Sequence, residues 1–252
     1  MAGRPDTAFA LAADWEKGTA EVLSYKVTRT GKTGPVQCRG NLVTERMYLM
    51  PDGKTDRKPA GKTWVEILNT VLSASGEDGG APFALETVVK FPRRGHMQLL
   101  RQDQSWQSWP GSTHRILDCR FSPPRLRVES SGGETIRDTI IGRWPVFTEE
   151  MLFTYLRSLP QHAGYREEVW FQDWGAEGRF AIQPQFAVIS VRSKAPAIRD
   201  METWYITVDR DDGRRSEFWV STSALHPVVL AVLMDRSIWT LQEIIRKKYW
   251  TW

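Results

Sequence analysis

Hydrophobic and polar residues alternate along most of this chain, in short segments that turn residues separate. The first alternating segment covers residues 19–29, and a second covers 35–45, with a Gly-Lys-Thr-Gly turn at 31–34 between them. Alternation with a period of two is typical of a strand that buries one face. The two segments and their turn therefore predict a β-hairpin near the start of the chain.

Many further strands are predicted, at a spacing of roughly 8–12 residues that is typical of a sandwich or barrel. They lie at 84–91, 96–102, 105–109, 114–121, 125–129, 135–141, 166–172, 179–183, 185–192, 202–208 and 216–221. We therefore expect a mainly β protein with a few helices. Its sheet is expected to be curved and antiparallel, as a half-open or closed β-barrel with the helices packed across it.

Three segments predict helices. Thr63 and Glu66 form a capping box that opens an apolar stripe over 64–75. A second helix is predicted over 148–159, where a threonine and two acids precede the apolar face and a proline follows it. A third is predicted over 237–249, with its isoleucines and leucine on one side and a basic end. The apolar segment 225–234 fits either a helix or a strand.

The chain is expected to form one antiparallel β-domain over 15–252, after a flexible arm at 1–14. A loose parallel between 15–147 and 148–252 leaves a pseudo-repeat open. Residues 7–13 contain an Ala-x-Ala pattern that resembles the tail of a signal peptide. If they are such a tail, the protein is periplasmic or extracellular, and otherwise it is cytoplasmic.

Twelve tryptophans in 252 residues change the picture from a generic β-domain to one with an aromatic interior. Tryptophan supplies a large apolar surface and one N–H group that needs a partner when buried. Some of these side chains can line a ligand cavity, and the alternative is that they only fill the core. The residues predicted to bind a ligand are Trp106, Trp109, Trp170, Trp204 and Trp219.

The charge and the motifs of the chain argue against several classes of protein. A net charge of +4 without a basic block does not favour nucleic-acid binding. No apolar run is long enough for an integral membrane helix. Phosphate-loop, dinucleotide, nucleophile and metal-ligand motifs are missing, so no cofactor and no metal are expected. Cys38 and Cys119 either form a disulfide, if their strands are neighbours, or stay free thiols.

The beginning and the end of the chain resemble a group of uncharacterised bacterial exported proteins with a lipoprotein-carrier-like curved β-sheet. The similar segments are Asp14-Trp15-x-x-Gly18-Thr-Ala-Glu-Val-x-x-Tyr25, the late hairpin with Trp204-Tyr-Ile-Thr-Val-Asp and Ser216-Glu-Phe-Trp-Val, and the Tyr249-Trp250 end. The resemblance implies a half-open barrel with helices across its concave side. It also implies binding of a lipid or another apolar molecule, and it indicates no catalytic residues.

The leading hypothesis is a lipocalin-like protein that binds or carries an apolar small molecule or lipid in a tryptophan-rich cavity. The first alternative is a cofactor-independent β-barrel enzyme, cyclase- or isomerase-like, that shapes a hydrophobic substrate and supplies one acid. The groups available for that acid are Tyr25, His114, Glu168 and Tyr205. The second alternative is an interaction module whose edge strands pair with a partner protein.

Overall fold

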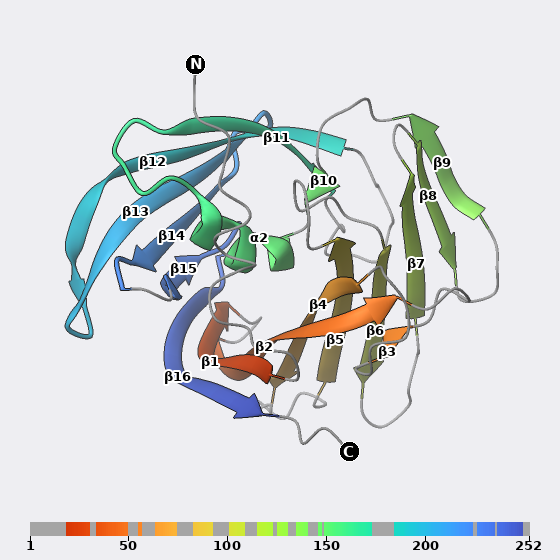
Figure 1. The fold of residues 1–252 in the computed structure, drawn as a ribbon, viewed down its shortest axis with the longest axis horizontal. Coiled ribbons are helices and arrows are strands. Elements are labelled where there is room, and N and C mark those ends of the chain that lie inside the picture. The colour runs from red at the N-terminus through yellow and green to blue at the C-terminus, as the bar shows by residue number, and fades with distance from the viewer. Residues whose placement is uncertain are drawn as a thin grey trace.

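A computed structural model of the chain describes residues 19–30, 34–49, 55–56, 64–74, 83–92, 101–108, 115–122, 125–130, 135–140, 146–147, 149–172, 184–223, 226–234 and 236–248. These residues form one curved, mostly antiparallel sheet with a short helical segment on its concave side (Figure 1). The predicted fold class is confirmed. The predicted arm at 1–14 and the predicted strand at 179–183 lie outside the described residues.

The first part of the chain forms a series of strands joined in sequence order. They are β1 (Thr19–Thr30), β2 (Pro35–Leu49), β3 (Thr55–Asp56), β4 (Trp64–Ala74), β5 (Phe83–Pro92), β6 (Arg101–Ser108), β7 (Arg115–Ser122), β8 (Arg125–Ser130) and β9 (Thr135–Ile140). The predicted first hairpin is β1 with β2. The two strands predicted at 96–102 and 105–109 are represented by the single strand β6.

The second part contains the helical segment and the remaining strands. They are β10 (Val146–Phe147), α2 (Glu149–Tyr155), the 3₁₀ helix η1 (Leu156–Ser158), β11 (Arg166–Gln172), β12 (Pro184–Ile198), β13 (Met201–Arg210), β14 (Arg215–Ser221), β15 (Val228–Val232) and β16 (Ile238–Lys248). The predicted helix over 148–159 and the hairpin of β13 with β14 are confirmed. The ambiguous segment 225–234 contains strand β15.

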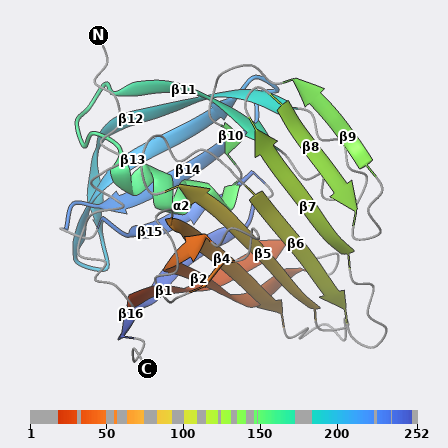
Figure 2. The same ribbon diagram turned by 45° about the vertical axis from the view of Figure 1, so that its right-hand side comes forward.

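The strand order joins the two ends of the described chain in the middle of the sheet. It runs β10-β11-β12-β13-β14-β15-β16-β1-β2-β4-β5-β6-β7-β8-β9, with β3 beside β2. All neighbours are antiparallel except β10 and β11. The strands β9 and β10 are the two ends of this path, so the described strands form an open, curved sheet and not a closed barrel (Figures 1 and 2).

The core lies on the concave side, between the helical segment and the strands β11–β16 and β1. On β1 the alternating residues Glu21, Leu23, Tyr25 and Val27 are all buried, whereas Lys26 is exposed. The apolar residues of the helical segment complete this core from the other side. They are Leu152, Phe153, Tyr155, Leu156 and Leu159. Burial of apolar surface stabilises a fold by about 25 cal/mol per Å². The apolar contact with the strands therefore holds the helix on the sheet.

The predicted helix over 64–75 is wrong, because this segment is strand β4. A capping box is a local signal, and pairing with other strands overrides it here. β4 is hydrogen-bonded along its length to β2 on one side and to β5 on the other. Its β-branched residues, Val65, Ile67 and Val71 among them, also suit an extended strand better than a helix.

The predicted helix over 237–249 is also wrong, because the segment is strand β16. A register shift explains the misleading pattern. Leu241 is paired with Tyr25 but Glu243 is paired with Ser24, so Gln242 is an extra residue. Beyond this bulge Ile244 is paired with Leu23 and packs against the core. A bulged strand thus brings residues three apart to one face, which imitates the spacing of a helix.

Candidate functional site

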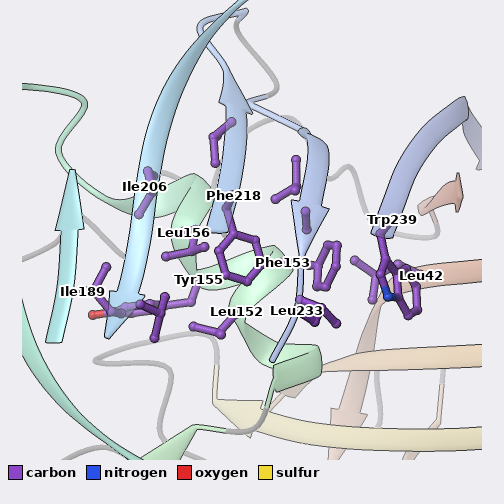
Figure 3. Packing of buried hydrophobic residues seen from close by; sticks show 14 of the residues in the cluster. Leu42, Leu152, Phe153, Tyr155, Leu156, Ile189, Ile206, Phe218, Leu233 and Trp239 are labelled. Atoms are coloured by element: carbon purple, nitrogen blue, oxygen red, sulfur yellow. The ribbon is translucent and has the colours of Figure 1, made fainter. Parts of the chain in front are cut away.

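Aromatic rings meet on the concave side of the sheet, where the helical segment contacts β1, β14 and β16. The ring centroid of Phe153 lies 5.4 Å from that of Tyr25, 5.7 Å from that of Phe218 and 5.3 Å from that of Trp239. Tyr25 and Trp239 are 5.7 Å apart. The edge-on and tilted arrangements are those that aromatic pairs prefer. Figure 3 shows Phe153 between Phe218 and Trp239, so the helix inserts one ring into a row of others.

Tyr25, the first predicted catalytic candidate, lies inside this aromatic cluster. Its side chain is 1% exposed, and its hydroxyl donates to the Val228 carbonyl oxygen at 2.9 Å. Burial raises the pKa of the phenol far above its ordinary value, and the nearby Arg157 cation only partly opposes this. A neutral, hydrogen-bonded phenol of this kind anchors β15 to β1.

A buried ion pair lies at the other end of the helical segment. Arg157 Nη1 donates to Glu21 Oε1 at 2.5 Å and Arg157 Nη2 donates to Glu21 Oε2 at 3.3 Å. Both residues are nearly inaccessible, at 6% and 2% exposure. The two parallel bonds match the planar guanidinium to the carboxylate. They tie η1 to the start of β1 and give the concave side one internal charged contact.

A second polar cluster joins the helix to β11. The Glu167 carboxylate accepts from the Tyr155 hydroxyl at 2.6 Å and from the Tyr165 hydroxyl at 3.1 Å. Burial, followed by the neighbouring Glu167 charge, raises the pKa of both phenols. The predicted candidate Glu168 is the next residue along the strand and is exposed. The carboxylate that enters the interior is therefore Glu167.

The predicted residues Tyr205 and Trp219 lie together on the convex side of the sheet. Their ring centroids are 5.1 Å apart, on paired positions of β13 and β14. The Tyr205 hydroxyl donates to Glu217, and burial and this hydrogen bond raise the pKa of Tyr205 to about 12. Trp204 is half-buried and packs against the core on the opposite side.

The remaining predicted ligand-binding residues are placed only by their backbone. Trp106 is in β6, paired with Leu85 and Arg115, and Trp170 is in β11, paired with Val146 and Phe186. Trp109 and His114 lie outside the described residues.

The strand register connects Trp106 to the described aromatic cluster. One cross-strand row runs from Tyr25 through Gly40, Leu72 and Leu85 to Trp106. Directly paired residues of antiparallel strands occupy the same face of a sheet. Two candidates chosen for different reasons, Tyr25 and Trp106, therefore belong to one row of the sheet.

The aromatic residues at the centre of the concave cluster were missed in the sequence. Trp239 was hidden in a segment predicted to be a helix, and Phe153 had no distinguishing neighbour. In the structure Trp239 and Leu241 are buried whereas Ile238 is exposed, and the sequence does not reveal this alternation because Ile238 is apolar as well.

The two cysteines do not meet the condition for a disulfide between neighbouring strands. Cys38 is in β2 and Cys119 is in β7, and β4, β5 and β6 lie between these strands. Cys38 is a buried free thiol. Burial raises the pKa of this thiol, which disfavours the reactive thiolate.

Within the described part of the chain, no three His, Cys, Asp or Glu side chains gather closely enough to hold a metal ion. None of the described helices has the length and apolar character needed to cross a membrane.

Comparison with known proteins gives a likeness in fold. No family model and no curated protein matches the chain. A similar solved structure is the β-barrel-like protein of domain of unknown function DUF1849 from Brucella abortus. Its TM-score is 0.54 at 11% identity, over 91% of this chain and 98% of that chain. A DUF1089 family protein from Pseudomonas aeruginosa gives a TM-score of 0.42 at 15% identity, over 68% and 90%.

The first likeness identifies the class of fold, which is β-barrel-like. An identity of 11% shows the fold alone, so the chemistry of this chain rests on its own residues.

Proposed function

We propose that this protein binds or carries an apolar small molecule or lipid on the concave side of its sheet. The observation that carries the proposal is the aromatic cluster of Tyr25, Phe153, Phe218 and Trp239, which a helix covers within an open, curved sheet. Small-molecule sites are mostly apolar and concave, with few polar groups. A curved β-sheet with an aromatic interior fits that description.

The ligand is proposed to lie along the row that joins Tyr25 to Trp106. The helix α2 packs against the Tyr25 end of this row, through Phe153. The row then continues across β2, β4 and β5 to β6. A ligand between α2 and these strands would contact the edge of the aromatic cluster without displacing it. The resemblance to lipoprotein-carrier-like exported proteins makes lipids the first class to test.

The first experiment is native mass spectrometry of the purified protein, followed by organic extraction and identification of what is released. The expected result is a bound hydrophobe whose mass is lost on extraction. The extracted protein is then titrated with that molecule, and tryptophan fluorescence reports binding. A protein that carries no hydrophobe and whose fluorescence no lipid or hydrophobe changes would contradict the proposal.

Two matched substitutions test the position of the ligand. Trp106→Ala is expected to weaken binding by about tenfold or more, because a large aromatic contact is lost. Trp219→Ala removes an equal side chain from the convex face, beside Tyr205, and is expected to leave the affinity unchanged. Equal losses in both variants would argue against a ligand on the concave side.

A cofactor-independent enzyme is the second candidate, and the Glu167 cluster favours it. A carboxylate that accepts from two phenols inside the fold is the kind of group that can take a proton from a substrate as a general base. Conversion of the extracted hydrophobe, lost in Glu167→Gln while binding persists, would support the enzyme. Unchanged hydrophobe on prolonged incubation would favour the carrier.

A further inference from the structure

A groove of about 380 Å³ lies on the convex face of the sheet, away from the aromatic cluster. It crosses β11, β12 and β13 next to the turn that precedes β11. Its lining residues are Gly164, Tyr165, Arg166, Val188, Ser190, Val191, Arg192 and Asp209. The paired residues Arg166, Ser190 and Thr207 mark this face, whereas Ile189 and Val208 on the other face are buried in the core.

One guanidinium in the groove is held in place by its neighbours. Arg192 is the extra residue of a register shift between Val191 and Ser193. Its Nε donates to Thr207 Oγ1 at 3.1 Å and its Nη2 donates to Asp209 Oδ2 at 3.1 Å. Bulges often redirect a side chain next to a functional site. The side chain is therefore fixed through two of its nitrogens, and a guanidinium has five N–H donors in all.

The acid beside Arg192 is neutralised from outside the groove. Arg215 Nε donates to Asp209 Oδ1 at 2.5 Å, and Arg215 does not line the groove. Burial raises the pKa of the Asp209 carboxyl, but hydrogen bonds from Arg215 and Thr207 more than offset this and lower it. Asp209 is thus a charged anchor whose negative charge is shared by two arginines.

The second guanidinium of the groove has no such anchor. Arg166 is exposed, and among the described residues its side chain takes part in no hydrogen bond or ion pair. Arg166 and Arg192 contribute two positive charges to the lining, against one negative charge from Asp209. With Arg215 pairing that acid, the groove has an excess of positive charge beside the Ser190 hydroxyl and the half-exposed Val188.

We propose that this groove is a second binding site, for a small organic carboxylate that Arg166 and Arg192 hold by its oxygens while Val188 contacts its apolar part. Arginine suits the task because its planar fork matches a carboxylate. The volume of about 380 Å³ is within the range of small-molecule sites and exceeds what a bare anion needs. The site is independent of the ligand proposed for the concave side.

Benzoate is the probe for this groove, and benzyl alcohol is its uncharged counterpart. NMR spectra of the protein, recorded at constant ionic strength during a titration, follow the arginine Nε–H and valine methyl signals. Benzoate is expected to shift the Arg192 and Val188 signals in a saturable way, and benzyl alcohol is expected to leave them in place. If the groove recognises an oxyanion alone, inorganic phosphate will displace benzoate. That result would overturn the requirement for an apolar part.

Three charge-removing variants complete the test. Arg166→Gln and Arg192→Gln are each expected to weaken benzoate binding by about tenfold or more, because a charge-assisted hydrogen bond is lost. Lys194→Gln removes an equal charge from the same strand outside the groove and is expected to bind as the unchanged protein does. Arg166 is exposed, so its variant keeps the fold and carries the test if Arg192→Gln does not.

Equal weakening in Lys194→Gln would show a general charge effect and overturn the site. Unsaturable shifts, or shifts confined to the concave residues, would also overturn it. Neither result bears on the apolar ligand, since the extraction experiment measures that ligand separately.

Discussion

At Gly40 the absence of a side chain decides how the aromatic cluster packs. A Cβ atom added there would lie 2.5 Å from Trp239 Cζ3 and 3.0 Å from Val27 Cγ2. The Trp239 indole is held by its own hydrogen bond, from Nε1 to Ser237 Oγ at 3.0 Å. It therefore lies across the strand at Gly40 and cannot turn away without losing this contact.

The variant Gly40→Ala is expected to lower the free energy of unfolding by about 1–3 kcal/mol, as overpacking in a core does. Chemical denaturation, followed by circular dichroism, measures this change. Lys26→Ala on the exposed face of β1 is the control and should change stability little.

A double variant separates steric conflict from a general weakness of β2. Trp239→Leu removes the indole, so Gly40→Ala should cost much less in that background than in the unchanged protein. An additive loss in the double variant would mean that Trp239 is not what Gly40 accommodates.

At the same scale, single residues show how far a sequence pattern reaches. The alternation at the start of the chain indicated a strand that buries one face, and Glu21, Leu23, Tyr25 and Val27 are buried on that face. It gave no reason for a buried acid in that set. The partner of Glu21 is Arg157, 136 residues later, and only the folded chain brings them together.

At the scale of elements, the ion pair between Glu21 and Arg157 connects the helical segment to the sheet. A buried charge that loses its partner is left without compensation in a medium of low dielectric constant. The element that depends on this contact is η1, since Arg157 is its only basic residue.

Removing one partner alone, in Glu21→Leu or Arg157→Met, is expected to cost about 3–5 kcal/mol of stability. Replacing both, in Glu21→Leu with Arg157→Met, should recover much of that loss because neither charge is left unpaired. Thermal and urea denaturation of the three variants measures the coupling. A double variant that is less stable than both single variants would contradict this account.

The elements also show where local signals fail. The segment at 148–159 is short, begins with cap-forming residue types in the sequence and is followed by proline, and it contains the helices α2 and η1. The segments at 64–75 and 237–249 have comparable local signals, yet both are strands that pair on two sides. Pairing with distant strands supplies hydrogen bonds that the sequence of one segment does not reveal.

At the scale of the whole molecule, buried phenols report on the integrity of the concave side. Tyr25, Tyr155 and Tyr165 come from β1, α2 and the turn before β11, and each is at most 4% exposed. Burial raises the pKa of all three, and Glu167 adds to this for Tyr155 and Tyr165. Their neutral forms therefore belong to the folded state.

The free energy of unfolding is expected to be independent of these groups below about pH 10 and to fall above it. The sign follows from linkage: the folded pKa values exceed the unfolded value of 10.0, so unfolding releases protons at alkaline pH. Each pH unit above 10 costs about 1.4 kcal/mol per tyrosine that stays protonated in the folded state.

Tyrosinate absorbance and far-ultraviolet circular dichroism, measured together from pH 8 to 13, test this expectation. The absorbance of the three buried phenols should rise only as the β-signal is lost. Tyr25→Phe should lower the tyrosinate absorbance that appears on unfolding by the contribution of one tyrosine. Ionisation of all tyrosines near pH 10 in a protein that keeps its β-signal would show that these phenols are accessible.

The sequence by itself determined the β character, the first and the late hairpins, and the helix at 148–159. These features depend on residues that are near one another in the chain, through alternation, turn residues and caps. It also led to an aromatic interior, but among the described residues that cluster contains one tryptophan, Trp239, beside Tyr25, Phe153 and Phe218.

Only the tertiary structure decided which face each candidate occupies and which distant groups meet. Glu167 and not Glu168 enters the interior, Trp219 lies outside while Trp204 lies inside, and Cys38 has no neighbouring strand that carries Cys119. The pairing of β11 with β12 and of β13 with β14 sets the faces of these residues, and the strand order from β2 to β7 separates the cysteines. Strand register and bulges arise from pairing between remote segments, and a shift of one residue exchanges the two faces of a strand.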